Sequence, residues 1–333
     1  MLGLLVGFAL SKGGPALSWS ECTKAGCTPH TASVVSDWKD GVQDSIDFDA
    51  LDYDKDIGVT TSGGSLSQRL VSKSTGKKVI GSRLYLLDSS GTKYQLFKFI
   101  GKEFTYDVDL AQIGCAVNAA LYTVEMAADG SKGSGSNRAK KGAEYGTGYC
   151  DGNYVDGTGC AEFDIQEANN KAMVYTTHGC SSPGQGVQGC DTSGCGYNVY
   201  RDSGNKAFWG TTINTAQKVT VVTQFVGSGA SLTEIRRRYV QGGKVIDVPD
   251  KTKYLNAAFC GAQKISGIAR SFVNGHVLVF SLWDSDGMSW LDGGNAGPCT
   301  GNERVAQIED ANPNAKVVWS NIKFGDIDTT YSA

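Results

Sequence analysis

Short runs rich in β-branched and aromatic residues, separated by glycine or by Asp, Ser and Asn turns, recur along the whole chain. Examples are GSRLYLLD at 81–88, VTVVTQF at 219–225 and VLVFSLWD at 277–284. Such runs are typical of strands, and the Gly-Gly in YVQGGKVI indicates a hairpin. The 44 glycines suit many tight turns. We find no long amphipathic helix and no alternation of strands with helices, so the pattern predicts an all-β chain folded as a large antiparallel sandwich.

The length of 333 residues is enough for one large core, and no linker divides the chain. We therefore expect a single domain over residues 11–333, with the polar stretch 128–148 as a surface loop and no appended module. Lys and Arg are scattered and the formal net charge is −3, which argues against nucleic acid as a partner. No run approaches the roughly 18 apolar residues that span a bilayer. We expect a monomer without a membrane partner.

The ten cysteines are even in number and dispersed, and the three histidines lie far apart. Zinc ribbons need closer pairs, so we predict no metal site. Dispersed cysteines favour disulfides and an oxidising compartment. Residues 1–10 contain LGLLVGFAL, which resembles the apolar core of a signal peptide, although a buried first strand is the alternative. Together these features predict a secreted protein.

The most informative segment is GCAEFDIQEANN at 159–170. Side chains at positions i and i+2 of a strand share a face. One face would therefore carry Glu162, Asp164 and Gln166, and the neighbouring apolar residues would face the core. Strict alternation sends Glu167 to the core face. A one-residue bulge between Asp164 and Glu167 would bring it back, and bulges are common beside active sites.

Three carboxyl groups in one place repel each other and raise each other's pKa. Hydrolysis of a glycoside with retention needs such a group, because one carboxylate attacks the anomeric carbon while another, protonated, donates to the leaving oxygen. The two carboxyls then lie about 5–5.5 Å apart. Glu162 and Glu167 can fill these roles, with Asp164 between them to orient the nucleophile. An exposed acidic strand without catalytic function is the alternative.

The segment EFDIQEAN resembles the pattern E-x-D-x-W-E-A-N of glycoside hydrolase family 7, the fungal and protist cellobiohydrolases and endoglucanases. GVTTSGGSLSQRLV, FTYDVDLAQIGCAVNAALYTVEM and AKVVWSNIKFG also resemble family segments, in family order, and the similarity runs from Ala16 to Asp326. The resemblance implies a concanavalin A-like jelly roll of two large antiparallel sheets, with a substrate cleft on the concave face. It implies no cofactor, since two carboxyl groups suffice for the chemistry.

The resemblance also implies roles for single residues. Glu162 would be the nucleophile, Glu167 the general acid/base and Asp164 the assistant of the nucleophile, with His178 beside the acid/base. Indole platforms for sugar rings would be Trp38, Trp283 and Trp290, for each of which core burial is the alternative. A product-side arginine would be Arg237, and polar residues lining the cleft would be Asn118, Tyr122, Tyr149 and Asp151. The implied disulfides are Cys22–Cys27, Cys115–Cys299, Cys150–Cys160, Cys180–Cys190 and Cys195–Cys260.

The chain departs from the family where loops roof the cleft into a tunnel. Only nine residues separate Cys150 from Cys160, a tunnel-entrance tryptophan is replaced by Asp40, and the tryptophan between the acids is Gln166. We therefore expect an open cleft and an endo-β-1,4-glucanase whose partner is a β-glucan polysaccharide. Alternatives are a mixed-linkage β-glucanase or cellobiohydrolase variant, an enzyme like those of family 16, and a glucan-binding sandwich without catalysis.

Overall fold

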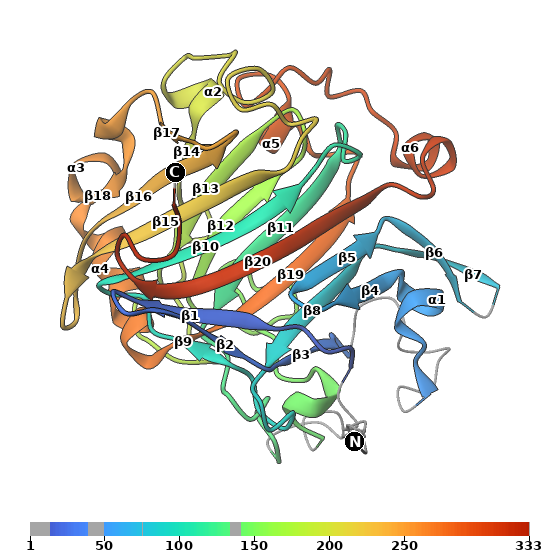
Figure 1. The fold of residues 1–333 in the computed structure, drawn as a ribbon, viewed down its shortest axis with the longest axis horizontal. Helices are drawn as coiled ribbons and strands as arrows, with labels where there is room; N and C mark the ends of the chain where they lie inside the picture. The colour runs from blue at the N-terminus through green and yellow to red at the C-terminus, as the bar shows by residue number, and fades with distance from the viewer. Residues whose placement is uncertain (1–13, 39–49, 75, 134–140, 333) are drawn as a thin grey trace, which may run out of the picture.

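The fold is a sandwich of two large, mainly antiparallel sheets (Figure 1). The computed structural model describes residues 14–38, 50–74, 76–133 and 141–332, so residues 1–10, Asp40 and part of the 128–148 loop lie outside the described residues. The prediction of a jelly-roll sandwich is confirmed.

The ten-stranded sheet has the order β17-β16-β15-β10-β20-β1-β2, with β18 beside β16, β5 beside β20 and β4 beside β5. Its neighbours pair antiparallel except β1 and β20, which run parallel. Its strands are β1 (Trp19–Thr23), β2 (Gly26–His30), β4 (Val59–Ser62), β5 (Ser65–Arg69), β10 (Lys102–Asp109), β15 (Val219–Ser228), β16 (Ser231–Gln241), β17 (Lys244–Asp247), β18 (Leu255–Asn256) and β20 (Lys316–Asp326).

The eight-stranded sheet has the order β14-β13-β12-β11-β19-β8-β3, with β9 beside β19. Its strands are β3 (Ser33–Ser36), β8 (Ser82–Leu87), β9 (Leu96–Phe97), β11 (Val117–Val124), β12 (Glu162–Ala168), β13 (Met173–His178), β14 (Cys195–Asn198) and β19 (His276–Asp284). A separate hairpin consists of β6 (Val71–Ser74) and β7 (Lys77–Ile80). The acidic segment therefore forms an interior strand of this sheet, β12, as its alternation indicates.

The core lies between the two sheets and is rich in aromatic side chains. Phe163 of β12 contacts Phe225 of β15 with ring centroids 5.3 Å apart, and Phe280 of β19 lies 6.1 Å from Trp319 of β20. All four residues are fully buried. Because Phe163 and Ile165 of β12 enter this core, Glu162 and Asp164 lie on the opposite face of the sheet. The packing thus fixes which side chains of β12 are available for chemistry.

Helices occupy the ends and connections of the sandwich. They are α1 (Tyr53–Ile57), α2 (Val199–Asp202), α3 (Ala257–Cys260), α4 (Ala262–Asn274), α5 (Ser289–Asp292) and α6 (Val305–Ala311), with short 3-10 turns η2 (Ala143–Tyr145) and η3 (Lys251–Lys253). None of those in the described part of the chain is long and apolar enough to cross a membrane.

The sequence prediction missed helix α4, which has 13 residues and is amphipathic. Its buried residues include Ile265, Ile268, Ala269 and Phe272. These follow the i, i+3, i+4, i+7 spacing of one helical face, so the signal was present in the sequence. The expectation that no long amphipathic helix occurs is therefore wrong.

Two local predictions are confirmed. The Gly-Gly turn joins β16 and β17, with Gln241 opposite Lys244, and both Gly242 and Gly243 have positive φ (59° and 70°), as a two-residue hairpin turn of this hand requires. All ten cysteines form disulfides, in the five pairs that the family resemblance implies: Cys22–Cys27, Cys115–Cys299, Cys150–Cys160, Cys180–Cys190 and Cys195–Cys260.

Candidate active site

Strand β12 contains the predicted bulge. Opposite β13, Asp164 pairs with Thr176 and Glu167 pairs with Val174, so two residues of β12 face the single residue Tyr175. The register against β11 shifts at the same level. The bulge reverses the alternation of β12, so that Glu167 follows Glu162 and Asp164 onto the sheet face turned away from the other sheet.

The same bulge turns Gln166 into the core, so the prediction that Gln166 shares a face with Glu162 is wrong. Gln166 is fully buried, its Oε1 accepts from the Tyr106 hydroxyl at 2.9 Å and its Nε2 donates to the Ala119 carbonyl at 3.2 Å. Tyr106 belongs to the other sheet. The exchange of the family's tryptophan for Gln166 therefore changes the contact between the sheets and does not change a sugar-binding surface.

Glu162 begins β12 and is 7% exposed. Its Oε2 accepts a hydrogen bond from the backbone N–H of Gly152 at 2.9 Å. Burial raises the pKa of Glu162 well above its usual value, and the neighbouring Asp164 raises it further, whereas His178 and the Gly152 N–H lower it. The carboxyl is thus poorly solvated and held by one backbone donor.

Asp164 and His178 form a buried pair, with Nε2 of His178 3.3 Å from Oδ2 of Asp164. The other ring nitrogen, Nδ1, lies 2.7 Å from the carbonyl oxygen of Asp191. Burial alone would lower the pKa of His178, but the hydrogen bond and charge of Asp164 outweigh it and raise the pKa to about 10. An imidazolium with both nitrogens donating satisfies both acceptors.

Glu167 stands at the other end of the acidic segment and receives a hydrogen bond from Nδ2 of Asn118 at 3.0 Å. Oδ1 of Asn118 accepts the backbone N–H of Ala168 at 3.1 Å, which fixes the direction of the amide. Burial and then the charge of Asp164 raise the pKa of Glu167 to about 8, although His178 and Asn118 lower it. Glu167 therefore holds a proton at neutral pH.

Two predicted tyrosines lie at the Glu162 end of the strand. Tyr122 sits opposite Asp164 in the β11–β12 register, and its hydroxyl is 2.9 Å from that of Tyr149. The Arg83 guanidinium lies 3.6 Å above the Tyr149 ring. Both tyrosines are mostly buried, so little of either side chain is open to a ligand.

Two other predicted residues are engaged inside the protein. Arg237 is fully buried; it donates to the Ile165 carbonyl and lies 4.2 Å above the Tyr175 ring. The structure therefore places Arg237 in the core and contradicts its prediction as a product-side residue, because no atom reaches the surface. Asp151 is 2% exposed, and its Oδ1 accepts the backbone N–H groups of Asn153 and Val155, which closes a turn in its own loop.

The predicted indoles form one pair and one separate residue. Trp283 and Trp290 are stacked with ring centroids 6.4 Å apart and planes at 24°, and Trp290 is 45% exposed. Trp283 sits opposite Asn118 in the β11–β19 register, so this pair adjoins the Glu167 end. Trp38 is half-buried and lies 6.0 Å from the ring of Tyr145.

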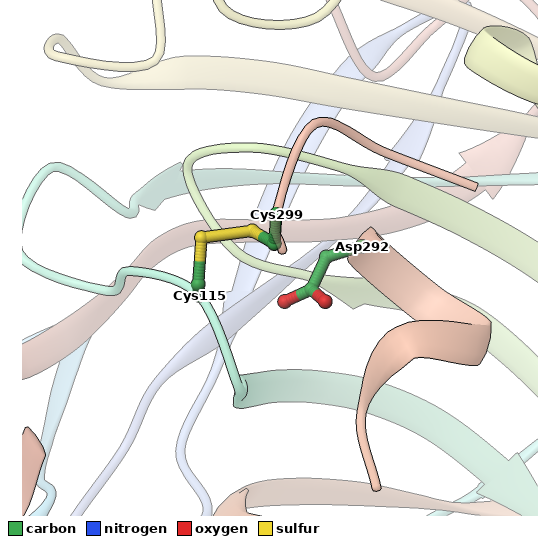
Figure 2. Close-up of side chains that lie close together, drawn as sticks. All are labelled: Cys115, Asp292 and Cys299. Atoms are coloured by element: carbon green, nitrogen blue, oxygen red, sulfur yellow. A yellow bond between two sulfur atoms is a disulfide. The ribbon is translucent and has the colours of Figure 1, made fainter. Parts of the chain in front are cut away.

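One group of side chains in the described residues has the spacing of a metal site, namely Cys115, Asp292 and Cys299 (Figure 2). The two sulfurs are bonded to each other, so neither is a thiolate ligand. Oδ2 of Asp292 accepts from the Ala116 N–H at 2.9 Å and from Nδ2 of Asn169 at 2.7 Å. The chemistry of this group is that of a structural disulfide beside a satisfied carboxyl.

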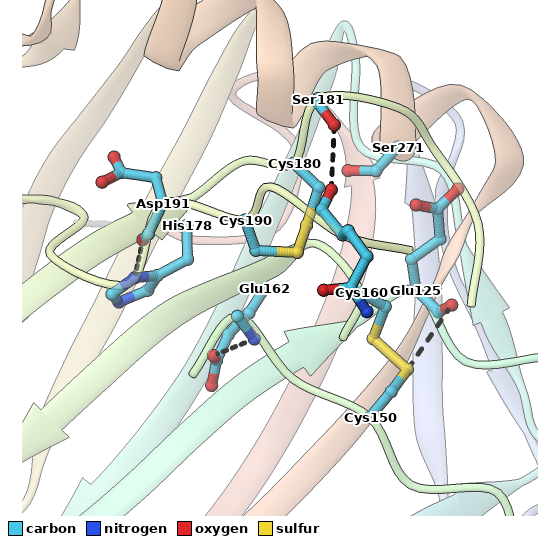
Figure 3. Close-up of a disulfide and its surroundings, with 12 residues drawn as sticks. Glu125, Cys150, Cys160, Glu162, His178, Cys180, Ser181, Cys190, Asp191 and Ser271 are labelled. Carbon is cyan, nitrogen blue, oxygen red and sulfur yellow. Dashed lines mark hydrogen bonds between the residues drawn. A yellow bond between two sulfur atoms is a disulfide. The ribbon is translucent and has the colours of Figure 1, made fainter. Parts of the chain in front are cut away.

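The sequence prediction missed two backbone groups that touch the site, the N–H of Gly152 and the carbonyl of Asp191 (Figure 3). Gly152 lies within the loop closed by Cys150–Cys160, and Asp191 directly follows the loop closed by Cys180–Cys190. A backbone atom leaves no mark on residue type, so the only signal was the closeness of both loops to β12 and β13 in the chain.

Comparison with known proteins agrees with this geometry. The family model described as glycosyl hydrolase family 7 matches residues 42–156 and 152–331. The structure is similar to that of a family 7 cellobiohydrolase from Daphnia pulex, with 27% identity, 97% of this chain and 99% of that chain covered, and a TM-score of 0.85.

It is similar also to endoglucanase I complexed with cellobiose, with 30% identity, coverage of 96% and 98%, and a TM-score of 0.85. A mutant of the endocellulase from Humicola insolens shows 32% identity, coverage of 95% and 98%, and a TM-score of 0.81. Since the family match extends over most of the sequence and the site lies on the matched strands, the chain belongs to glycosyl hydrolase family 7, a family of retaining cellulases.

Proposed function

We propose that this protein is a secreted endo-β-1,4-glucanase that cleaves its substrate by double displacement, with Glu162 as nucleophile and Glu167 as general acid/base. The observation that carries the proposal is the bulged strand β12, which turns both carboxyls and Asp164 to one face. The five disulfides support an extracellular location. We also retain the prediction of one catalytic domain over residues 11–333.

The raised pKa of Glu167 supports its role as the acid, while the raised pKa of Glu162 does not by itself distinguish the two groups. Glu167, with a pKa of about 8, carries the proton that the leaving oxygen needs. Glu162 attacks the anomeric carbon, and the bond to the leaving sugar breaks as Glu167 gives up its proton. Glu167, now ionised, takes a proton from water, and the resulting attack splits the ester to Glu162 and restores both groups. The N–H of Gly152 favours the ionised form of Glu162.

The Asp164–His178 pair supports the nucleophile without reacting. The imidazolium lowers the pKa of both Glu162 and Glu167 and offsets part of the repulsion among the three carboxyls. Because the Asp191 carbonyl fixes the ring, the positive charge keeps one position during the reaction. We assign Asp164 and His178 as positioning residues.

Endo action is supported by the short connections at the site. Asp151 and Gly159 form a β-bridge that closes the 151–159 connection. Cys180 and Cys190, which flank the 181–189 connection, form a second β-bridge beside their disulfide. The exposed face of Trp290 offers a stacking platform at the leaving-group end. Short loops and an exposed platform suit a polymer chain that enters from the side.

The first experiment compares loss of viscosity with release of reducing ends on carboxymethylcellulose, for the wild type and Glu162→Gln. Endo cleavage lowers viscosity early, when few ends have been released, and the variant should be inactive. An intact polymer after incubation with wild type would refute the β-1,4-endoglucanase. Binding of the polymer without cleavage would instead indicate a glucan-binding protein.

A cellobiohydrolase is the second candidate, because the Daphnia pulex cellobiohydrolase has the same TM-score as endoglucanase I. The same assay separates the two, since exo action releases many reducing ends before viscosity falls. Parallel digestion of mixed-linkage glucan tests the remaining alternative.

A further inference from the structure

The loop between Cys150 and Cys160 lies just before the nucleophile, Glu162, in the chain. The disulfide closes it, and Cys160 lies two residues before Glu162 (Figure 3). The other end of the loop brings the Gly152 N–H within 2.9 Å of Oε2 of Glu162. Both ends of this small ring therefore converge on one carboxyl group.

Additional contacts hold the loop in place. The N–H of Cys160 donates to the Asp151 carbonyl at 3.1 Å, and the Asp151 carboxylate accepts two N–H groups within the turn. Asp156 forms an ion pair with Arg83 of β8 at 3.2 Å. Since Arg83 is anchored in turn by Asp37 at 3.1 Å, the loop is tied to the sheet at both its base and its tip.

Position 152 has no room for a side chain. A Cβ atom there would lie 2.5 Å from Cβ of His178 and 3.2 Å from Oε2 of Glu162. Gly152 does not have a positive φ, so its backbone conformation is open to other residues. The requirement for glycine is therefore one of space, because the loop backbone packs directly against β13.

We propose that Gly152 is a positioning residue of the reaction: its missing side chain lets the disulfide-closed loop approach His178, and its N–H then holds Glu162 in the attacking orientation. The proposal rests on the assignment of Glu162 as nucleophile. A larger residue would push the loop away from His178 and lengthen the N–H to carboxylate contact, while Glu167 and Asn118 would be untouched.

The test is Gly152→Ala beside the matched control Gly114→Ala. Gly114 also lacks a positive φ, and a Cβ there meets no atom within 4 Å. Both variants are assayed on 2,4-dinitrophenyl β-cellobioside, whose leaving group needs no proton, and thermal unfolding establishes that both are folded. On this substrate, only the attack by Glu162 limits formation of the glycosyl-enzyme.

We expect kcat/KM of Gly152→Ala to fall about tenfold to a hundredfold, as for a small misplacement of a reacting group, with Gly114→Ala within about twofold of wild type. The acidic limb of the pH profile should move to higher pH, because loss of the donor disfavours ionised Glu162. A normal rate, or a lower rate with an unmoved acidic limb, would overturn the proposal. Inactivity of wild type itself would instead refute the proposed function.

Discussion

Each of the two sheets buries a glutamate on one of its interior strands, and the two carboxyl groups differ in how many hydrogen bonds they accept. Glu103 of β10 is fully buried and accepts from Nε2 of Gln224 at 2.7 Å, from the N–H groups of Asp328 and Thr330 at 3.1 Å each, and from the Thr330 hydroxyl. Glu162 of β12 accepts one hydrogen bond, from the Gly152 N–H.

The difference separates a structural carboxyl from a reactive one. Four donors fill the oxygens of Glu103 and fasten the chain near Thr330 to the outer face of the ten-stranded sheet. A carboxylate so engaged is a weak nucleophile, because its lone pairs are already shared. Glu162, with one donor and Asp164 beside it, keeps lone pairs free for an anomeric carbon at the cost of an unfavourable charge.

The largest effect should come from Glu162→Gln. Removal of the nucleophile should lower kcat by at least about a thousandfold on carboxymethylcellulose. The fold should be no less stable, because a buried and repelled carboxyl has been neutralised. Initial rates and thermal unfolding midpoints, measured on the same preparation, test both parts. Activity within tenfold of wild type would show that Glu162 does not react.

The converse is expected of Glu103→Gln. One carboxylate oxygen becomes an amide that faces donors, which should lower the free energy of unfolding by about 2 kcal/mol. The folded enzyme should keep kcat/KM within about twofold, since Glu103 lies on the opposite sheet. Urea unfolding and the activity assay form the test. A Glu103→Gln variant that is stable but inactive would show that Glu103 is needed for activity and is not a purely structural carboxyl.

The sequence predicted the sandwich and the acidic strand because both depend on local alternation. Phe163 and Ile165 identify the core face of β12, and the charge at Glu167 identifies the need for a bulge. The prediction was wrong for Gln166, because the bulge itself decides on which face of the sheet this side chain lies. It was wrong also for Arg237, whose burial depends on the Ile165 carbonyl and the Tyr175 ring across the sandwich.

The remaining features could not be predicted because they depend on contacts between residues far apart in the sequence or on backbone atoms. Glu103 and Thr330 are 227 residues apart, and no periodic pattern in the sequence connects them. The Gly152 N–H and the Asp191 carbonyl act through the backbone, so their residue types carry little information. Disulfide pairing was accessible only through the resemblance to a family, because ten cysteines alone allow many pairings.

A smaller effect is expected at Glu167, whose single side-chain donor can be removed by Asn118→Ala. This donor favours the ionised carboxyl, so its loss should raise the pKa of Glu167 above about 8. The basic limb of the kcat/KM profile should then move up by about one pH unit, since the general acid stays protonated longer.

The 2,4-dinitrophenyl substrate is the control for this shift, because a leaving group that needs no proton should show no basic limb from Glu167. The comparison uses profiles on carboxymethylcellulose and on the aryl glycoside for both proteins. A downward shift in Asn118→Ala would contradict the assignment of Asn118 as a donor to the ionised form.

The smallest effect is expected for a third carboxyl, that of Asp284 at the end of β19. Its surroundings are intermediate between those of Glu103 and Glu162. Its Oδ2 has no hydrogen-bond partner among the described residues. Burial, followed by the adjacent carboxyl of Glu309 on α6, raises the pKa of Asp284 to about 6, whereas Lys78, which is ion-paired with Glu309, lowers it. The other charged group in this cluster is Asp310, whose Oδ1 lies 3.2 Å from Nζ of Lys78.

Because the folded protein binds the proton of Asp284 more tightly than the unfolded chain, its stabilising effect is present below pH of about 4 and is lost as pH rises through about 6. Asp284→Asn should therefore match wild type at pH 4 and exceed it by about 1 kcal/mol at pH 8. Asp310→Asn is the control, since the Asp310 side chain is 81% exposed and its loss should alter the pH course little. Urea midpoints at pH 4, 6 and 8 decide the matter: parallel curves for wild type and Asp284→Asn would mean that Asp284, like Glu103, is fully compensated in the fold.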